Sequence, residues 1–348
     1  MKTPRGPMPV AFFGIAVGSL ALVNAWRLAA RLWPVPAALV DVLTFAALAT
    51  WLVILLTYAH KWLRHRAAAQ AEMQHPVQSS FAALGPVSSM LAALALANYD
   101  RPAALALFGV AVVAQLALGV FLHGRLWQGG RPPELVTPAI YLPTVAPGFV
   151  AATGFATFGW PQVGMAFFGV GMLSWIALES LILHRAAVHG ALPDALRPSL
   201  GIQIAPPVVG GIAWMSLTSG TPDAFAMILL GYGLYQALLM ARLVPWIRAQ
   251  PVSPSWWGFS FGVAALPGMA LRMVERGATG PLEWLAPALF VMANIVIGLF
   301  IVKTVSLLVQ GRLLPALPAS AAASSAAQGD EADSRTVVQL PVRRTQFK

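Results

Sequence analysis

The stretch WWGFSFGVAALPGM, residues 256–269, places a proline among two tryptophans, two phenylalanines and three glycines, and it carries no charge. A proline inside a helix removes a backbone donor and clashes with the preceding turn, so this segment would be a poor helix in water. Within a bilayer, broken backbone is tolerated only where protein covers it or where it lines a water-filled cavity. The stretch therefore favours a broken membrane helix that lies inside a bundle.

The composition of the whole chain supports a membrane setting. Of the 348 residues, 58% are hydrophobic and 10% are charged, whereas charged residues make up about 25% of soluble domains. The absence of cysteine excludes disulfides, thiolate metal sites and cysteine nucleophiles. We predict a polytopic, all-α membrane protein whose first partner is the lipid bilayer.

A window of about 20 residues identifies ten candidate spanning helices. An even number of spans places both termini on the same side of the membrane. The apolar segments cover residues 8–27, 38–60, 77–98, 102–122, 138–158, 161–183, 199–219, 222–247, 255–274 and 282–309.

Basic residues indicate which side that is, because loops kept in the cytoplasm accumulate Lys and Arg. With both termini cytoplasmic, only five of the 22 basic residues fall outside, namely Arg27, Arg31, Arg101, Arg272 and Arg276. The net charge of +10 is therefore assigned to topology, and we expect no nucleic-acid partner.

The chain is predicted to divide into a membrane domain, residues 1–312, and a C-terminal tail, residues 313–348. The tail is rich in Ala and Ser and then mixed in charge. It has too little apolar surface to fold alone, so we predict a disordered cytoplasmic tail.

Proline and paired glycine concentrate in the odd-numbered segments, at positions roughly 60–70 residues apart, a spacing typical of a repeated unit. The pattern predicts five helical hairpins, with five kinked helices around a central passage and five smoother helices outside them. The alternative is ordinary packing kinks, because Gly and Pro are enriched in membrane helices anyway. The marked positions are Gly14 and Gly18, Gly85-Pro86, Pro143, Pro147-Gly148, Pro206-Pro207, Gly210-Gly211, Gly262 and Pro267-Gly268.

The central portions of the odd segments contain no Asp, Glu, Lys or Arg. They offer neither an acidic ring for cations nor a buried carboxylate relay for proton coupling. Freed N–H groups at kinks and helix-end dipoles suit weak anion contacts, so the pattern favours a weakly selective anion pore. Glu179, near the inner end of the sixth segment, is expected to pair with Arg185 or Arg242. No catalytic constellation, cofactor site or metal cluster is visible.

Stretches along nearly the whole chain resemble the bacterial tellurite-resistance (TehA) family and the plant slow anion channels, in the tellurite-resistance/dicarboxylate transporter superfamily. The matching stretches are FFGIAVG (12–18), HPVQSSFAALGPVSSM (75–90), LWQGG (126–130), YLP (141–143), FFGVGMLSWIALE (167–179), GIQIAP (201–206), LLGYGLYQ (229–236), RLVPWI (242–247) and WWGFSFG (256–262).

The resemblance implies a multi-pass protein of the bacterial inner membrane, built as five hairpins and assembled as a homotrimer with one pore per subunit. It also implies that Phe261 closes the pore. Phe259 and Phe261 differ by about 200° around a helix, so only one of them can point down the passage. Ala16 stands where the family pattern has a proline, whereas Pro147 and Pro267 are additions. The expected pore-lining residues are Gly14, Gly18, Pro86, Pro143 and Pro206.

Three classes of function remain open. The favoured one is a gated channel for small inorganic anions such as chloride or nitrate. The alternative is a secondary carrier or exporter of tellurite, sulfite or a C4-dicarboxylate, for which a basic residue at mid-depth in the passage would be expected. A membrane enzyme or cofactor-binding protein is the weakest of the three, because no catalytic constellation is present.

Overall fold

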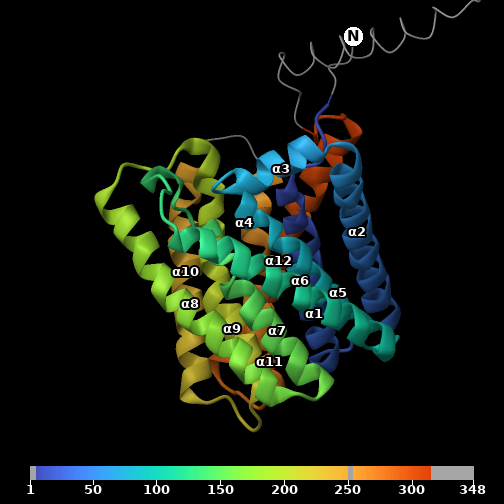
Figure 1. The fold of residues 1–348 in the computed structure, drawn as a ribbon. Coiled ribbons are helices and arrows are strands. Elements are labelled where there is room, and N and C mark those ends of the chain that lie inside the picture. Colours follow the sequence, from blue (N-terminus) through green and yellow to red (C-terminus); the bar gives the residue numbers. More distant parts are fainter. Residues whose placement is uncertain (1–4, 250–253, 315–348) are drawn as a thin grey trace, which may run out of the picture.

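A computed structural model describes residues 5–249 and 254–314, which fold into a bundle of helices (Figure 1). Within these ranges ten helices are long and apolar enough to cross a membrane, which confirms the number expected from the sequence. The predicted tail lies outside the described residues from residue 315 onward.

The even-numbered spans are single long helices, whereas each odd-numbered span is made of two pieces. The even spans are α2 (Ala37–Arg64), α6 (Arg101–Trp127), α8 (Pro161–Val188), α10 (Ala224–Ile247) and α12 (Pro281–Val309). The odd spans are η1 (Val10–Phe12) with α1 (Phe13–Leu32), α4 (Gln78–Ala82) with α5 (Leu84–Leu96), η3 (Pro138–Tyr141) with α7 (Val145–Phe158), η4 (Asp194–Ile204) with α9 (Ala205–Leu217), and η5 (Pro254–Phe259) with α11 (Ser260–Glu275).

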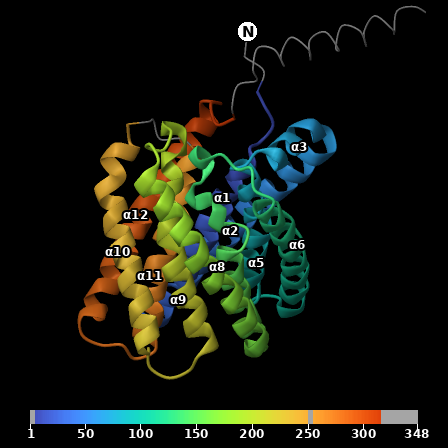
Figure 2. The same ribbon diagram turned by 60° about the vertical axis from the view of Figure 1, so that its left-hand side comes forward.

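The two kinds of span occupy different layers of the bundle. Between 61% and 83% of the most apolar stretch of each odd span is buried inside the protein, against 22% to 33% for the even spans. Contacts run from α1 to α5, α7, α9 and α11 and back to α1, which closes a ring of five. Each even helix packs against the odd helix that precedes it in the chain (Figure 2). This agrees with the inner and outer layers expected from the sequence.

The prolines of three odd spans lie where an α-helix begins. Pro86, Pro147 and Pro206 all fall in the first turn of α5, α7 and α9. The N–H groups of a first turn have no partner within the helix, so a proline is tolerated there. These residues therefore follow the break in each span instead of kinking a continuous helix.

Pro267 was expected to bend the ninth span, and the structure places it inside a continuous helix. The span changes from 3-10 to α-helix at Ser260, seven residues earlier, and α11 then continues through Pro267 to Glu275. Pro245 and Pro287 likewise lie inside α10 and α12 without ending them. A proline in a membrane segment therefore does not by itself end a helix.

A short helix that the sequence analysis did not predict, α3 (Arg66–Gln74), joins the second and third spans. It is held by the buried ammonium of Lys61, which lies 2.7 Å from Glu72 and donates a hydrogen bond to the carbonyl of Met8. His75 then ends α3, and its Nδ1 accepts hydrogen bonds from the N–H groups of Val77 and Gln78. This network ties the N-terminal segment to the end of α2.

Arg5 lies beside Gly311, so the beginning and the end of the described chain meet at one end of the bundle. At this end the odd spans begin and the even spans finish. Most basic residues gather here, and it is called the basic end below.

Two helix contacts depend on the absence of a side chain. A Cβ at Gly148 would lie 2.7 Å from the backbone nitrogen of Gly171, where α7 crosses α8. A Cβ at Gly18 would lie 2.2 Å from Oγ of Ser260, where α1 meets α11. Small residues allow this close approach of membrane helices.

Gly148→Ala should therefore destabilise the bundle by about 1–3 kcal/mol, because the atoms in the way belong to the backbone of α8 and cannot rotate aside. The measurement is thermal unfolding of the purified protein in detergent. Gly109→Ala in α6 is the matched control, since a Cβ there meets nothing within 4 Å. Equal melting temperatures for the two variants would contradict the close α7–α8 contact.

Candidate functional site

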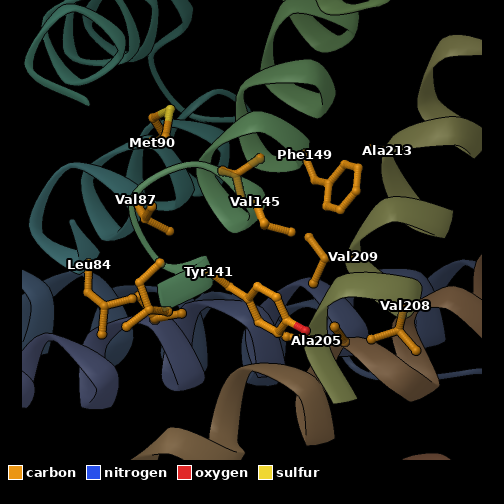
Figure 3. Close-up of a cluster of buried hydrophobic side chains, with 14 of the residues drawn as sticks. Leu84, Val87, Met90, Tyr141, Val145, Phe149, Ala205, Val208, Val209 and Ala213 are labelled. Atoms are coloured by element: carbon orange, nitrogen blue, oxygen red, sulfur yellow. The ribbon is translucent and has the colours of Figure 1, made fainter. Parts of the chain in front are cut away.

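Two small cavities lie inside the ring of odd spans, and all five of these spans contribute to each. The first, of about 30 Å³, is lined by residues near the beginning of each odd span, including Gly14, Leu84, Tyr141, Pro206 and Phe261. The first cavity therefore lies nearer the basic end. Figure 3 shows Leu84, Tyr141 and Val209, which all border it, among the buried side chains that converge from α5, η3 and α9.

The second cavity, of about 70 Å³, is lined by residues further along the same spans, including Asn24, Leu91, Thr153, Ile212 and Gly268. Each cavity has room for only a few water molecules. Phe261 and Val209 border both cavities. These two side chains therefore lie between the two spaces.

The residues around Phe261 fix the direction in which it points. The hydroxyl of Ser260 donates hydrogen bonds to the carbonyls of Gly14 (3.1 Å) and Trp257 (2.7 Å). Phe259 points elsewhere, because it is buried against Gly201 and stacks on Trp256 with ring centroids 5.6 Å apart. Of the two phenylalanines, only Phe261 borders the cavities described.

Behind the apolar wall of the first cavity lies a polar cluster that the sequence analysis missed. Tyr141 donates its hydroxyl to the carboxylate of Glu179 in α8. The same carboxylate accepts hydrogen bonds from Tyr232 and from the indole of Trp175, each at 3.3 Å. The lone acid among the apolar residues of the sixth segment was a signal in the sequence. Two of its partners lie on other elements, η3 and α10, and the third lies one turn earlier on α8.

The prediction that Glu179 forms an ion pair with Arg185 or Arg242 is wrong. Within the described residues its carboxylate makes no salt bridge to Arg185 or to Arg242. Arg185 instead donates to the carbonyl of Pro133, 3.3 Å away, and Arg242 is exposed. The phenol and indole donors hold the carboxylate without a cation.

The wall of the second cavity includes a positively charged side chain, Arg27, which the sequence analysis placed only at the outer end of a helix. Arg27 of α1 borders the cavity, and its guanidinium donates to the carbonyls of Leu94 (3.3 Å) and Ala95 (2.6 Å). The Tyr99 ring lies 5.7 Å from it. The carbonyls and the ring orient the guanidinium, and within the described part of the chain no carboxylate forms a salt bridge with it.

The five expected pore-lining residues do not all lie at the same cavity. Gly14 and Pro206 border the first cavity, as Phe261 does. Gly18 lies against Ser260, Pro143 borders two cavities on the α6 side of the ring, and Pro86 is absent from the lining of both axial cavities. The pore-lining role of all five remains a prediction. In the described ranges, no three His, Asp or Glu side chains are grouped so that they could hold a metal ion.

These features define a multi-pass α-helical membrane protein with two cavities on the axis of an inner ring of broken spans. Residues 7–305 match the model of the SLAC1 family, described as a voltage-dependent anion channel. The chain therefore belongs to the SLAC1 family.

Individual relatives agree with this assignment. The chain is 34% identical over 307 residues to the tellurite resistance protein TehA homolog of Haemophilus influenzae, covering 88% of this chain and 92% of the relative. It is 23% identical over 307 residues to the S-type anion channel SLAH3 of Arabidopsis thaliana. That match covers 85% of this chain and 48% of the plant protein, so the chain spans about half the length of this relative.

The position of Phe261 between the two cavities has a consequence for chemical access from the two sides of the membrane. The chain has no cysteine, so single cysteines report without background. We expect Ala11→Cys, in the first cavity, and Asn24→Cys, in the second, to react with a small charged thiol reagent from opposite sides. The measurement is labelling in sealed vesicles of known orientation. Labelling of both positions from the same side would contradict a separation of the two cavities at Phe261.

Proposed function

We propose that the protein is a channel for small inorganic anions such as chloride and nitrate, and that Phe261 closes its passage. The observation that carries the proposal is the position of Phe261 between two cavities, each lined by all five inner spans. An aromatic ring in a narrow apolar bore blocks ions sterically and by keeping water out. Removing the ring joins the two cavities into one path.

The charges along this path favour anions. No Asp or Glu is among the residues that line either cavity, and Arg27 borders the second. Cation channels concentrate acidic side chains at their constrictions, whereas Arg and Lys line anion pathways. The half-buried carboxylate of Glu179 does not line either cavity, and it contacts the wall of the first through the hydroxyl of Tyr141. The relatives named as S-type anion channels support the same choice.

The proposed location is the bacterial inner membrane, with the basic end in the cytoplasm. The relative from Haemophilus influenzae supports a bacterial setting. The distribution of basic residues supports the orientation, because retained loops accumulate Lys and Arg. This orientation would place the beginning of the chain and the end of α12 on the cytoplasmic side.

The proposed assembly is a homotrimer with one passage in each subunit. Gly169 in α8 and Gly231 in α10 leave open space on the outer surface, where a neighbouring helix can approach closely. The molar mass of the purified protein, measured by light scattering with correction for detergent, tests the assembly directly.

Replacing Phe261 with Ala should raise the current by at least about tenfold, because the ring that excludes water is removed. The measurement is current across a planar bilayer with a salt gradient, and the reversal potential should lie near the equilibrium potential of the anion. Phe261→Leu is the matched control: it keeps an apolar plug of smaller size and should pass an intermediate current.

The carrier alternative predicts a different result. In that case both variants would remain electrically silent, while vesicles would show saturable uptake of tellurite, sulfite or a C4-dicarboxylate. If Phe261→Ala is well folded and electrically silent and shows such uptake, the channel proposal is wrong and the protein is a carrier.

Arg27→Gln in the Phe261→Ala background should lower the anion conductance by about two- to fivefold at low salt and by less at high salt. Loss of a fixed positive charge lowers the local concentration of anions, and added salt screens that effect. Conductance over a series of salt concentrations is the measurement. An unchanged conductance at every salt concentration would remove Arg27 from the pathway.

A further inference from the structure

A third cavity, of about 120 Å³, lies at the basic end, outside the ring axis. It is bounded by α4, by the end of α6 with the loop that follows it, and by η3. Its polar lining consists of Ser79, Ser80, His123, Arg125 and Arg131. No acidic side chain belongs to the lining.

The local backbone brings the two arginines to this space. α6 ends at Trp127, and the next residues include Gly129 and Gly130, whose φ angles of 78° and 77° favour glycine. This double glycine turn places Arg131 beside the last turns of α6. Arg125 is anchored by a hydrogen bond of 2.8 Å from Nη1 to the carbonyl of Met73.

The positive charge in the cavity is not compensated by the described residues. Nη1 of Arg131 is buried and has no hydrogen-bond partner there. Burial and the neighbouring charge of Arg125 both lower the pKa of Arg131. Neither arginine forms a salt bridge within the described ranges; of the nearby acids, Glu72 is paired with Lys61 and Glu134 is exposed. A buried donor without a partner calls for a ligand, since desolvating it unpaired is costly.

We propose that this cavity binds a phosphate-like oxyanion. Two guanidinium groups, two serine hydroxyls and an imidazole supply donors from several directions, and arginine forks match the oxygens of phosphate. The cavity has room for several water molecules, enough for such a group. The shared chemistry fits either free inorganic phosphate or the phosphate of an anionic lipid headgroup.

The site lies directly behind the wall of the first cavity. Ser80 precedes Phe81, and Ile140 precedes Tyr141, and both Phe81 and Tyr141 border the first cavity. An oxyanion bound here therefore contacts the two segments, α4 and η3, that shape the entrance to the axis from the basic end. Binding itself does not depend on the role of Phe261.

The first experiment is calorimetric titration of the detergent-purified protein with inorganic phosphate, in a buffer whose anion is gluconate. We expect one phosphate per subunit, and Arg131→Gln should weaken its binding by about tenfold or more. Arg248→Gln is the matched control, because it removes the same charge from an exposed position at the same end of the bundle. It should leave the affinity within about twofold.

The second experiment separates a lipid headgroup from free phosphate. The protein is reconstituted in nanodiscs of phosphatidylcholine alone or with phosphatidylglycerol, and bound lipid is counted by native mass spectrometry. A lipid site retains phosphatidylglycerol in the native protein and in Arg248→Gln but loses it in Arg131→Gln. At a site for free phosphate, Arg131→Gln binds phosphate more weakly than the native protein and Arg248→Gln in the calorimeter, but the three proteins retain no phosphatidylglycerol.

Thermal unfolding of each variant checks its folding, and Ser80→Ala, which should weaken binding by about two- to tenfold, replaces Arg131→Gln if that protein unfolds. The proposal is overturned if the native protein binds neither phosphate nor phosphatidylglycerol. It is also overturned if Arg131→Gln, or its replacement, binds as tightly as Arg248→Gln.

Discussion

Every backbone N–H and C=O group within a bilayer must find a partner inside the protein, because lipid offers none. The broken odd spans cannot satisfy this condition against lipid at their 3-10 segments and first turns. They are therefore buried, and five continuous helices take the positions on the outside. The layered architecture follows from this one requirement, and the axial cavities follow from the layering, since they lie where the five broken spans meet.

The contact between α1 and α11 sets the position of Phe261 on that axis. Ser260 occupies the space that a Cβ at Gly18 would fill, and its hydroxyl reaches the carbonyl of Gly14. Once Ser260 faces α1, its two neighbours must point in other directions. Phe259 then fills the space over Gly201, and Phe261 borders both cavities. A pair of small residues thus orients a large one.

The sequence predicts the features that depend on regular patterns. Ten spans follow from apolar length, and the inner position of the odd spans follows from where proline and glycine gather. The separation of Phe259 from Phe261 follows from helix periodicity. The exact breaks were less predictable, because the effect of a proline depends on its turn: Pro206 begins an α-helix, whereas Pro267 lies within one.

Features made by tertiary contact were missed for a different reason. Arg27 looks like any basic residue near a helix end until Leu94 and Ala95 of α5 draw its guanidinium to the second cavity. Two of the three donors to Glu179 come from residues 38 and 53 positions away in the chain. No local pattern records such partners. The lone acid in an apolar segment signals that partners exist without naming them.

The ring is closed by a contact between the first and the ninth span, and the Ser260–Gly14 hydrogen bond joins residues 246 positions apart. During synthesis the first span enters the membrane long before the ninth leaves the ribosome. Until then one flank of α1, including the bare surface at Gly18, has no permanent neighbour. Contacts this distant in sequence form slowly, and exposed intermediates are prone to wrong association. The assembly of this bundle therefore depends on how long the first helix must wait for its neighbour, and insertion of the last hairpin, α11 with α12, is the step that closes the ring.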